Sequence, residues 1–154
     1  ILDKARSHNL THITDNIRHK PSFICNCCSC CCELLAGIHN GYTDGVAKAN
    51  FTVQVDGDIC TDCGVCVKAC NAKALELRDE NQRKLKVLEN VCLGCGACIS
   101  SCPSGALSLI SLNRPEPPNK KKDLFVRILK EKKRMTPFVV GRVKKTLRKP
   151  FARD

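Results

Sequence analysis

Two runs of four cysteines are the residues of this 154-residue chain best suited to chemistry. They read Cys60-x2-Cys63-x2-Cys66-x3-Cys70 and Cys92-x2-Cys95-x2-Cys98-x3-Cys102, the second followed by Pro103. The first three thiols of each run are separated by two residues, so one tight loop brings their sulfur atoms together. Soft sulfur ligands that converge in this way are suited to a polynuclear iron–sulfur site.

The two runs belong to an internal repeat. Residues 55–77 align with residues 87–109 at an offset of 32, and nine of the 23 positions are identical, including all four cysteines. The fourth cysteine of each run lies beyond the loop on a helical turn that points it away from the first three, so we expect it to reach the site of the other repeat. We therefore assign one [4Fe–4S] cluster to Cys60, Cys63, Cys66 and Cys102, and a second to Cys92, Cys95, Cys98 and Cys70.

Each repeat predicts a short strand, the cysteine loop, a turn of helix and a second short strand. The strands are expected at residues 52–56 and 74–78, and again at 85–89 and 106–112. One repeat is too small to bury a core, whereas two copies packed face to face can do so. We therefore predict an α+β fold, a pseudo-twofold sandwich. Seven apolar residues are expected to keep water from the clusters: Ile59, Val65, Val67, Val91, Leu93, Ala97 and Ile99.

Zinc and disulfides are the alternatives for these eight cysteines. A structural zinc site needs four ligands in two separated pairs, whereas each run here has three plus one. Disulfides need an oxidising compartment. Charged residues interrupt every apolar stretch near the start of the sequence, so we expect no export signal and no membrane span. The prediction is a cytoplasmic protein whose cysteines are reduced ligands.

The duplicated motif also carries a family resemblance. Residues 51–112 resemble a bacterial-type two-cluster [4Fe–4S] ferredoxin, which implies a ferredoxin-type sandwich, low reduction potentials and one-electron transfer. Asn71 follows Cys70 where this family has proline, whereas Pro103 keeps the pattern. We expect Asn71 to alter the bend of the chain without affecting ligation. Because four thiolates per cluster leave no iron open, we interpret the chain as an electron carrier or the electron-transfer subunit of an oxidoreductase complex, and not as an enzyme.

A block of six further cysteines precedes the repeats: Cys25, Cys27, Cys28, Cys30, Cys31 and Cys32. Vicinal thiols cannot all point to one side of a strand or helix. We predict a third metal site here, with an iron–sulfur centre that extends the electron path as the favoured form. A zinc site, a reactive thiol or disulfide site, and a block without a cofactor remain open, as does a reductase that uses these cysteines on a substrate.

The block carries a looser resemblance. The phrase from Phe23 to Cys32, directly ahead of a two-cluster unit, resembles the C-terminal half of larger 4Fe-4S proteins of anaerobic prokaryotes. This resemblance implies an electron-transfer role and a shortened or truncated chain. Before the block, residues 1–9 predict a helix with Leu2 and Ala5 inward, and residues 10–17 predict a strand. His8 and His12 are expected to be surface residues and not ligands.

The positive charge divides the chain further. Residues 113–154 hold fifteen Lys and Arg against four Asp and Glu, which accounts for the whole net charge of +11. We therefore expect three parts: an extension at 1–50, the two-cluster domain at 51–112, and a proline-rich linker with a basic helical tail at 113–154. Asp123 is expected to cap a first amphipathic helix and Thr136 a second, with Pro137 at its first position.

Basic amphipathic helices suit an acidic surface. We expect this tail to bind a redox partner that is acidic at its docking surface, or the chain's own two-cluster domain. Peripheral contact with a membrane and a solvated extension are the alternatives. Nucleic acid is disfavoured, because few aromatic residues accompany the basic ones and no base-reading module is present.

Overall fold

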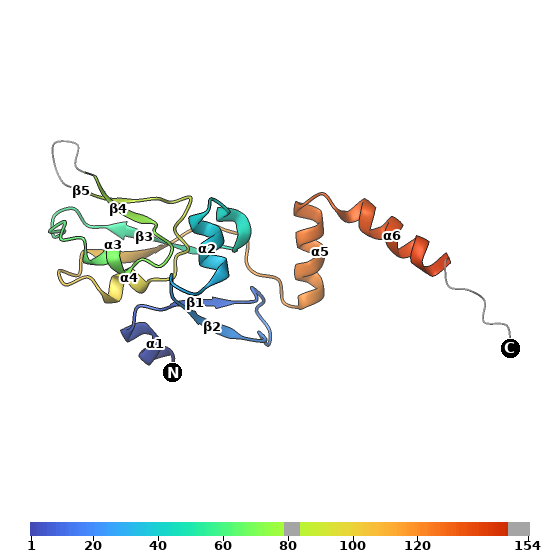
Figure 1. The fold of residues 1–154 in the computed structure, drawn as a ribbon, viewed down its shortest axis with the longest axis horizontal. Coiled ribbons are helices and arrows are strands. Elements are labelled where there is room, and N and C mark those ends of the chain that lie inside the picture. The colour runs from blue at the N-terminus through green and yellow to red at the C-terminus, as the bar shows by residue number, and fades with distance from the viewer. Residues whose placement is uncertain (79–83, 148–154) are drawn as a thin grey trace. The chain divides into compact units, whose positions relative to one another are not determined.

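The computed structural model describes residues 1–78 and 84–147, with side chains up to Arg142 (Figure 1). The chain forms two compact units. The first comprises Ile1–Asp15 with Ser22–Glu116, and the second comprises Asn16–Pro21 with Pro117–Asp154. Within the described residues, no helix has the length and apolar content needed to cross a bilayer.

Four strands of the first unit come from the two repeats. They are β3 (Phe51–Val55), β4 (Leu75–Arg78), β5 (Lys84–Val87) and β6 (Leu107–Ser111), which confirms the expected strands to within two residues at each end. The polar link expected between β4 and β5 falls largely on residues 79–83, outside the described residues.

The strand pairing follows the internal repeat. Strand β3 pairs antiparallel with β6, and β4 pairs antiparallel with β5, in two separate sheets. Val55 lies opposite Leu107, and Leu75 lies opposite Val87. Val87 and Leu107 are the repeat equivalents of Val55 and Leu75. Replacing both residues of one pair by their repeat equivalents therefore gives the other pair. Each sheet therefore joins one strand from each repeat.

The helical turns α3 (Val65–Ala69) and α4 (Ala97–Ser100) follow the two cysteine loops and pack against each other. Each begins directly after a glycine in the left-handed region, Gly64 at φ 77° and Gly96 at φ 73°. A residue with a Cβ is strained in this conformation. The two glycines therefore let each loop turn sharply into its helix.

The N-terminal segment packs on the repeats as part of the same unit. Helix α1 (Leu2–Ser7) is followed by the antiparallel pair β1 (Thr11–Thr14) and β2 (Ile24–Cys27), then by helix α2 (Glu33–His39) and the short 3-10 helix η1 (Thr43–Gly45). The expected helix and strand are confirmed, and Ala5 is buried. The expectation that Leu2 points inward is wrong, because 49% of its surface is exposed.

Helix α2 joins the core of the repeats. Leu35 is fully buried and Ile38 is 4% exposed, and both lie in one apolar cluster with Val53, Leu75 and Leu107. The repeats alone bury few large side chains, so α2 supplies bulk that they lack. The segment before the repeats is thus structurally bound to the domain that it precedes.

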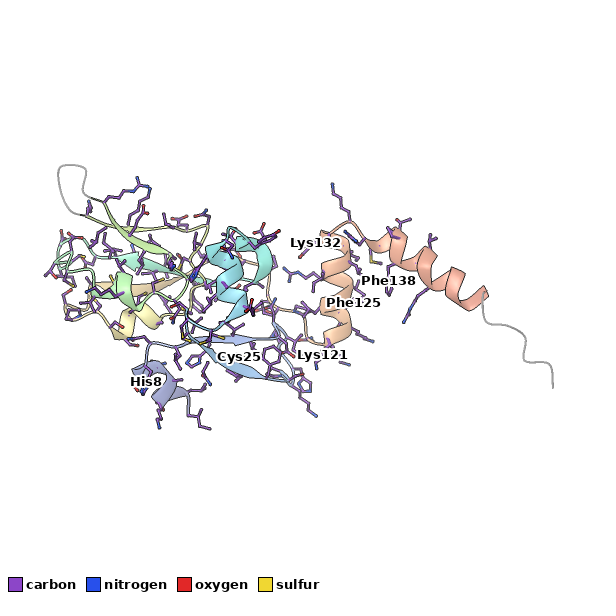
Figure 2. All side chains as sticks on the ribbon, in the orientation of Figure 1. His8, Cys25, Lys121, Phe125, Lys132 and Phe138 are labelled. Atoms are coloured by element: carbon purple, nitrogen blue, oxygen red, sulfur yellow. The ribbon has the colours of Figure 1, made fainter. Side chains whose placement is uncertain are left out.

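The second unit contains two helices, α5 (Lys121–Glu131) and α6 (Met135–Leu147). Phe125 and Phe138 meet edge to face between them, with ring centroids 5.3 Å apart, and the Arg142 guanidinium lies 5.3 Å from the centre of the Phe138 ring (Figure 2). The two expected helices are confirmed, but both expected caps are wrong. Helix α5 begins two residues before Asp123, and α6 begins one residue before Thr136.

Candidate metal centres

The first candidate centre is a cavity of about 300 Å³, its open mouth included, beside α3. Its walls carry the thiols of Cys60, Cys63 and Cys66 from the first loop and Cys102 from the second repeat. Apolar side chains Leu85 and Leu107 complete part of the lining. The structure therefore brings together the four cysteines that the sequence assigned to one cluster.

The second candidate centre is the repeat equivalent of the first. A cavity of about 330 Å³ is lined by Cys92, Cys95, Cys98 and Cys70. The rest of its lining is apolar or glycine, with Val53, Leu75 and Leu93 as the larger side chains. The fourth cysteine again comes from the other repeat, so the two sets cross over between the repeats.

Three of the thiols that line these cavities ionise less readily than an ordinary cysteine. Burial raises the pKa of the Cys98 thiol to about 12, and the nearby Cys70, Cys95 and Cys92 add to the shift. Burial likewise raises the pKa of Cys70 and of Cys66. Bound cations would supply the positive charge that favours the thiolate form of the four cysteines in one cavity. Four sulfur donors around one cavity therefore fit an iron–sulfur cluster.

Water exclusion is less complete than the sequence indicated. Leu93 and Ala97 are buried, and Val67, Val91 and Ile99 are half-buried. Ile59 and Val65 are 48% and 42% exposed, so the expectation that they shield the clusters is wrong. Ile59 and Val65 directly precede Cys60 and Cys66, which line the first cavity, whereas neither of the two lines it.

A carboxylate distinguishes the first centre from the second. Asp62 lines the first cavity, and its Oδ1 lies 3.6 Å from the Cys60 sulfur. The same oxygen accepts a hydrogen bond from the Leu85 N–H at 2.7 Å, which fixes its position. The equivalent residue in the second repeat is Gly94. Negative charge beside a cluster disfavours its reduction, so Asp62 would lower the potential of a cluster held at the first centre.

A buried hydroxyl distinguishes the second centre. Thr11 on β1 is 1% exposed, and its Oγ1 lies 3.7 Å from the Cys95 sulfur. Asn71 donates a hydrogen bond into the same oxygen at 3.2 Å. With a metal bound, the Cys95 thiolate could only accept, and the Thr11 hydroxyl would be the donor of this hydrogen bond. A hydrogen bond to a ligand sulfur favours the reduced cluster, so Thr11 would raise the potential of a cluster held at the second centre.

Asn71 holds this arrangement together. Its amide nitrogen also donates to the Asn9 carbonyl at 2.6 Å, its amide oxygen accepts from the Ser29 N–H at 3.1 Å, and its own carbonyl accepts from His39 Nε2 at 2.9 Å. These partners lie after α1, in the cysteine block and at the end of α2. Proline at this position has no side-chain amide, so the departure from the ferredoxin pattern joins the N-terminal segment to the chain just after Cys70.

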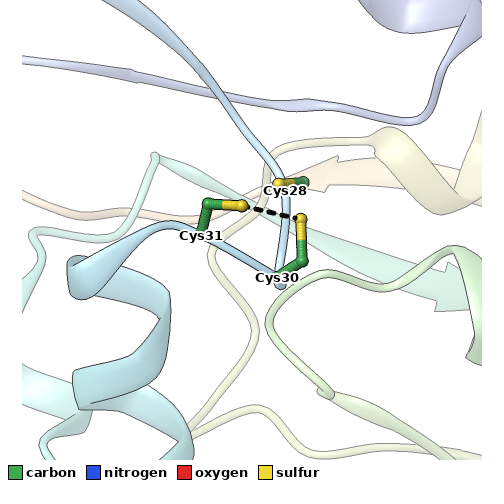
Figure 3. A group of neighbouring side chains, drawn as sticks. All are labelled: Cys28, Cys30 and Cys31. Atoms are coloured by element: carbon green, nitrogen blue, oxygen red, sulfur yellow. Dashed lines mark hydrogen bonds between the residues drawn. The ribbon is translucent and has the colours of Figure 1, made fainter.

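The cysteine block is divided by the structure into two groups. The sulfur atoms of Cys28, Cys30 and Cys31 lie within 4.8 Å of one another, with 3.2 Å between Cys30 and Cys31 (Figure 3). Hydrogen bonds from Cys30 and from the Cys31 backbone lower the pKa of Cys28 to about 7. Of the other three, Cys27 interacts with both Cys32 and Cys25.

The second group is closer to the core. Cys27 and Cys32 are half-buried and pack against the apolar cluster, whereas Cys25 is exposed on β2. Burial, together with Cys32, raises the pKa of Cys27 to about 12. A protonated, packed cysteine behaves as a small apolar residue. All fourteen cysteines of the chain are free thiols in this structure.

His8 and His12 were both expected at the surface, and the structure shows His8 exposed and His12 half-buried. His12 pairs with Asn26 Oδ1 across β1 and β2 at 2.8 Å. Sequence reasoning missed Thr11 and His39 and assigned Asn71 no more than a bend. The one signal that could have found them was the asparagine itself, a side chain with three hydrogen-bonding positions where the repeat has proline.

Comparison with known proteins agrees with the geometry. Residues 59–106 match the family described as the 4Fe-4S dicluster domain. No curated protein matches the chain. The matched segment contains all eight cysteines that line the two cavities. Residues 59–106 are therefore a ferredoxin-type 4Fe-4S dicluster domain, and the cofactors that such a domain implies are two [4Fe–4S] clusters.

Proposed function

We propose that this chain transfers single electrons to a partner redox enzyme, as a carrier or as a subunit of an oxidoreductase complex. A dicluster domain implies electron transfer. The observation that carries the proposal is the grouping of thiols: each cavity is lined by three cysteines of one loop and the fourth of the other repeat. In this proposal Cys60, Cys63, Cys66 and Cys102 hold one cluster, and Cys92, Cys95, Cys98 and Cys70 hold the other.

When bound, the clusters supply reversible one-electron chemistry, and the residues of the chain set where an electron is most stable. Asp62 opposes added negative charge at the first centre, and Thr11 stabilises it at the second. The second centre therefore has the higher potential. It is also the centre to which Asn71 connects the cysteine block, through Ser29.

The cysteine block supports a third metal centre in the same protein. Three of its six thiols converge, and a loop anchored by Asn71 presents them. A reductase that uses the block as a thiol–disulfide pair is the second candidate, because the Cys30 and Cys31 sulfur atoms are 3.2 Å apart and exposed. Reactivity toward a disulfide substrate that survives loss of the dicluster cysteines would favour this second candidate.

The basic helices support a protein partner with an acidic docking surface. Helices α5 and α6 expose large apolar side chains beside their cations, among them Phe125, Ile128 and Val139. The side chains of α6 are described only as far as Arg142. Charge steering of this kind weakens as salt is added. Binding to a membrane surface remains the alternative for this tail, and a sedimentation assay with anionic vesicles separates the two.

Anaerobic purification tests the proposal. The full chain is expected to carry about eight irons and eight sulfides in its dicluster domain. On reduction, electron paramagnetic resonance should show the split signal of two interacting clusters. A chain with one iron per loop, or with cystines in place of ligands, would refute the proposal. We propose a reducing, anaerobic cytoplasm as the location, because such a compartment keeps thiols reduced and clusters intact.

A further inference from the structure

The spacing of sulfur atoms differs between the cysteine block and the dicluster cavities. Within the described part of the chain, Cys28, Cys30 and Cys31 are the one group of three metal-ligating residues whose donor atoms all lie within 4.8 Å of one another. No three of the eight dicluster cysteines meet this spacing, although all eight are described. The cysteine block therefore fits a smaller metal centre than the two dicluster cavities do.

The size of that metal centre follows from the distances between sulfur ligands in known coordination geometries. In a cubane, each cysteine binds a different iron at a corner of the cube, so the sulfur atoms are held well apart. Around a single tetrahedral ion with metal–sulfur bonds of about 2.3 Å, two sulfur atoms are separated by about 3.8 Å. The block, with one pair at 3.2 Å and every pair within 4.8 Å, matches the single ion.

The loop that carries the three thiols is held at both ends and at its middle. Strand β2 ends at Cys27, and α2 begins at Glu33 directly after Cys32. Between them, the Ser29 N–H donates to Asn71 Oδ1. Cys27 and Cys32 at the two ends pack against the core, whereas Cys30 and Cys31 between them are exposed and Cys28 is half-buried. The three ligands are thus positioned before any metal binds.

We propose that Cys28, Cys30 and Cys31 form a site for one thiophilic divalent ion, with Zn²⁺ as the ion that fits, and not for a third iron–sulfur cluster. Three thiolates leave one tetrahedral position for a water or an external thiolate. Cys30 and Cys31 are exposed, so this position opens to the solvent. Binding exchanges thiol protons for the metal and involves no change of oxidation state. The site deepens the proposed function by naming the content of its third centre.

Metal analysis of the anaerobically purified full chain tests this site. We expect one zinc per chain in addition to the iron of the dicluster domain. In the Cys28→Ser variant the zinc should be lost while iron and the reduced-state spectrum are retained. Cys25→Ser is the matched control, because Cys25 is an exposed block cysteine outside the trio and its loss should leave both metals in place.

Protein that is purified without zinc is then titrated with Co²⁺, whose thiolate complexes absorb strongly. One equivalent should bind to the parent and to Cys25→Ser, and none to Cys28→Ser. A third set of irons that disappears in Cys28→Ser would overturn the proposal, as would equal metal loss in both variants. A block found as a disulfide that binds no Co²⁺ after reduction would also overturn it. The iron content of the dicluster domain is counted separately, so failure here leaves the electron-transfer proposal standing.

Discussion

Replacing Thr11 with valine removes one hydrogen bond from the second centre and little else. Valine has nearly the shape of threonine, and Thr11 is 1% exposed, so no water can take the place of the lost hydroxyl. Cys95 loses the donor 3.7 Å from its sulfur. Asn71 loses one acceptor but keeps the Asn9 carbonyl for its amide nitrogen. The N-terminal segment should therefore stay in place.

The expected change in midpoint potential follows from the free energy of the lost hydrogen bond. A hydrogen bond of this kind contributes about 0.5–1.5 kcal/mol, and it strengthens as the cluster gains negative charge. We take the hydrogen bond to be stronger by about 0.5–1 kcal/mol in the reduced state than in the oxidised state. For one electron, about 59 mV corresponds to a tenfold change in the equilibrium constant, so this difference changes the potential by about 20–40 mV. Thr11→Val should lower the higher of the two midpoint potentials by this amount.

The assay is an anaerobic potentiometric titration followed by electron paramagnetic resonance. Thr11→Ser keeps the hydroxyl and should titrate like the parent. Ser104→Ala is the matched control at the first centre, where the Ser104 hydroxyl lies 3.6 Å from the Cys102 sulfur but is exposed, so that water can replace it. Unchanged midpoints in Thr11→Val, or equal shifts of both, would refute the role assigned to Thr11.

Three more predictions concern the same structure. Asp62→Asn keeps an oxygen for the Leu85 N–H but removes the charge, so the lower midpoint should rise by tens of millivolts in the same titration, on the order expected for a charge near a surface site; a fall would contradict the placement of Asp62. Asn71→Ala removes three side-chain hydrogen bonds, so hydrogen exchange should speed up at residues 9–11 and 29 while the iron content stays constant; unchanged exchange would deny Asn71 its bridging role. Removal of iron by a chelator should unfold residues 51–112, because their small core depends on the clusters; a circular dichroism spectrum like that of the loaded protein would contradict this.

The dicluster domain was predictable because its information is local. The spacing of four cysteines fixes which sulfur atoms share a loop, and the offset of 32 fixes how the two loops are related. The structure agrees with both patterns. Val55 pairs with Leu107 and Leu75 pairs with Val87, in registers that are equivalent under the repeat. The exposure of Ile59 and Val65 was not predictable in this way, since hydropathy says nothing of which side of a tight loop faces outward.

The cysteine block was not predictable in the same way because its order comes from distant contacts. Six cysteines in eight residues offer many possible ligand sets, and local spacing favours none of them. The pairing of β1 with β2, the burial of Leu35 on α2, and the hydrogen bond from Ser29 to Asn71 separate Cys28, Cys30 and Cys31 from the rest. Each of these contacts joins segments that the sequence pattern treats independently.

We propose above all that two [4Fe–4S] clusters are each held by thiolates of both repeats. Anomalous diffraction at the iron edge, from crystals grown without oxygen, tests it most directly. We predict two four-iron peaks, with Cys102 on the cluster of the first loop and Cys70 on the cluster of the second. Clusters whose four ligands all come from a single repeat, or lone metal ions in the two loops, would contradict it.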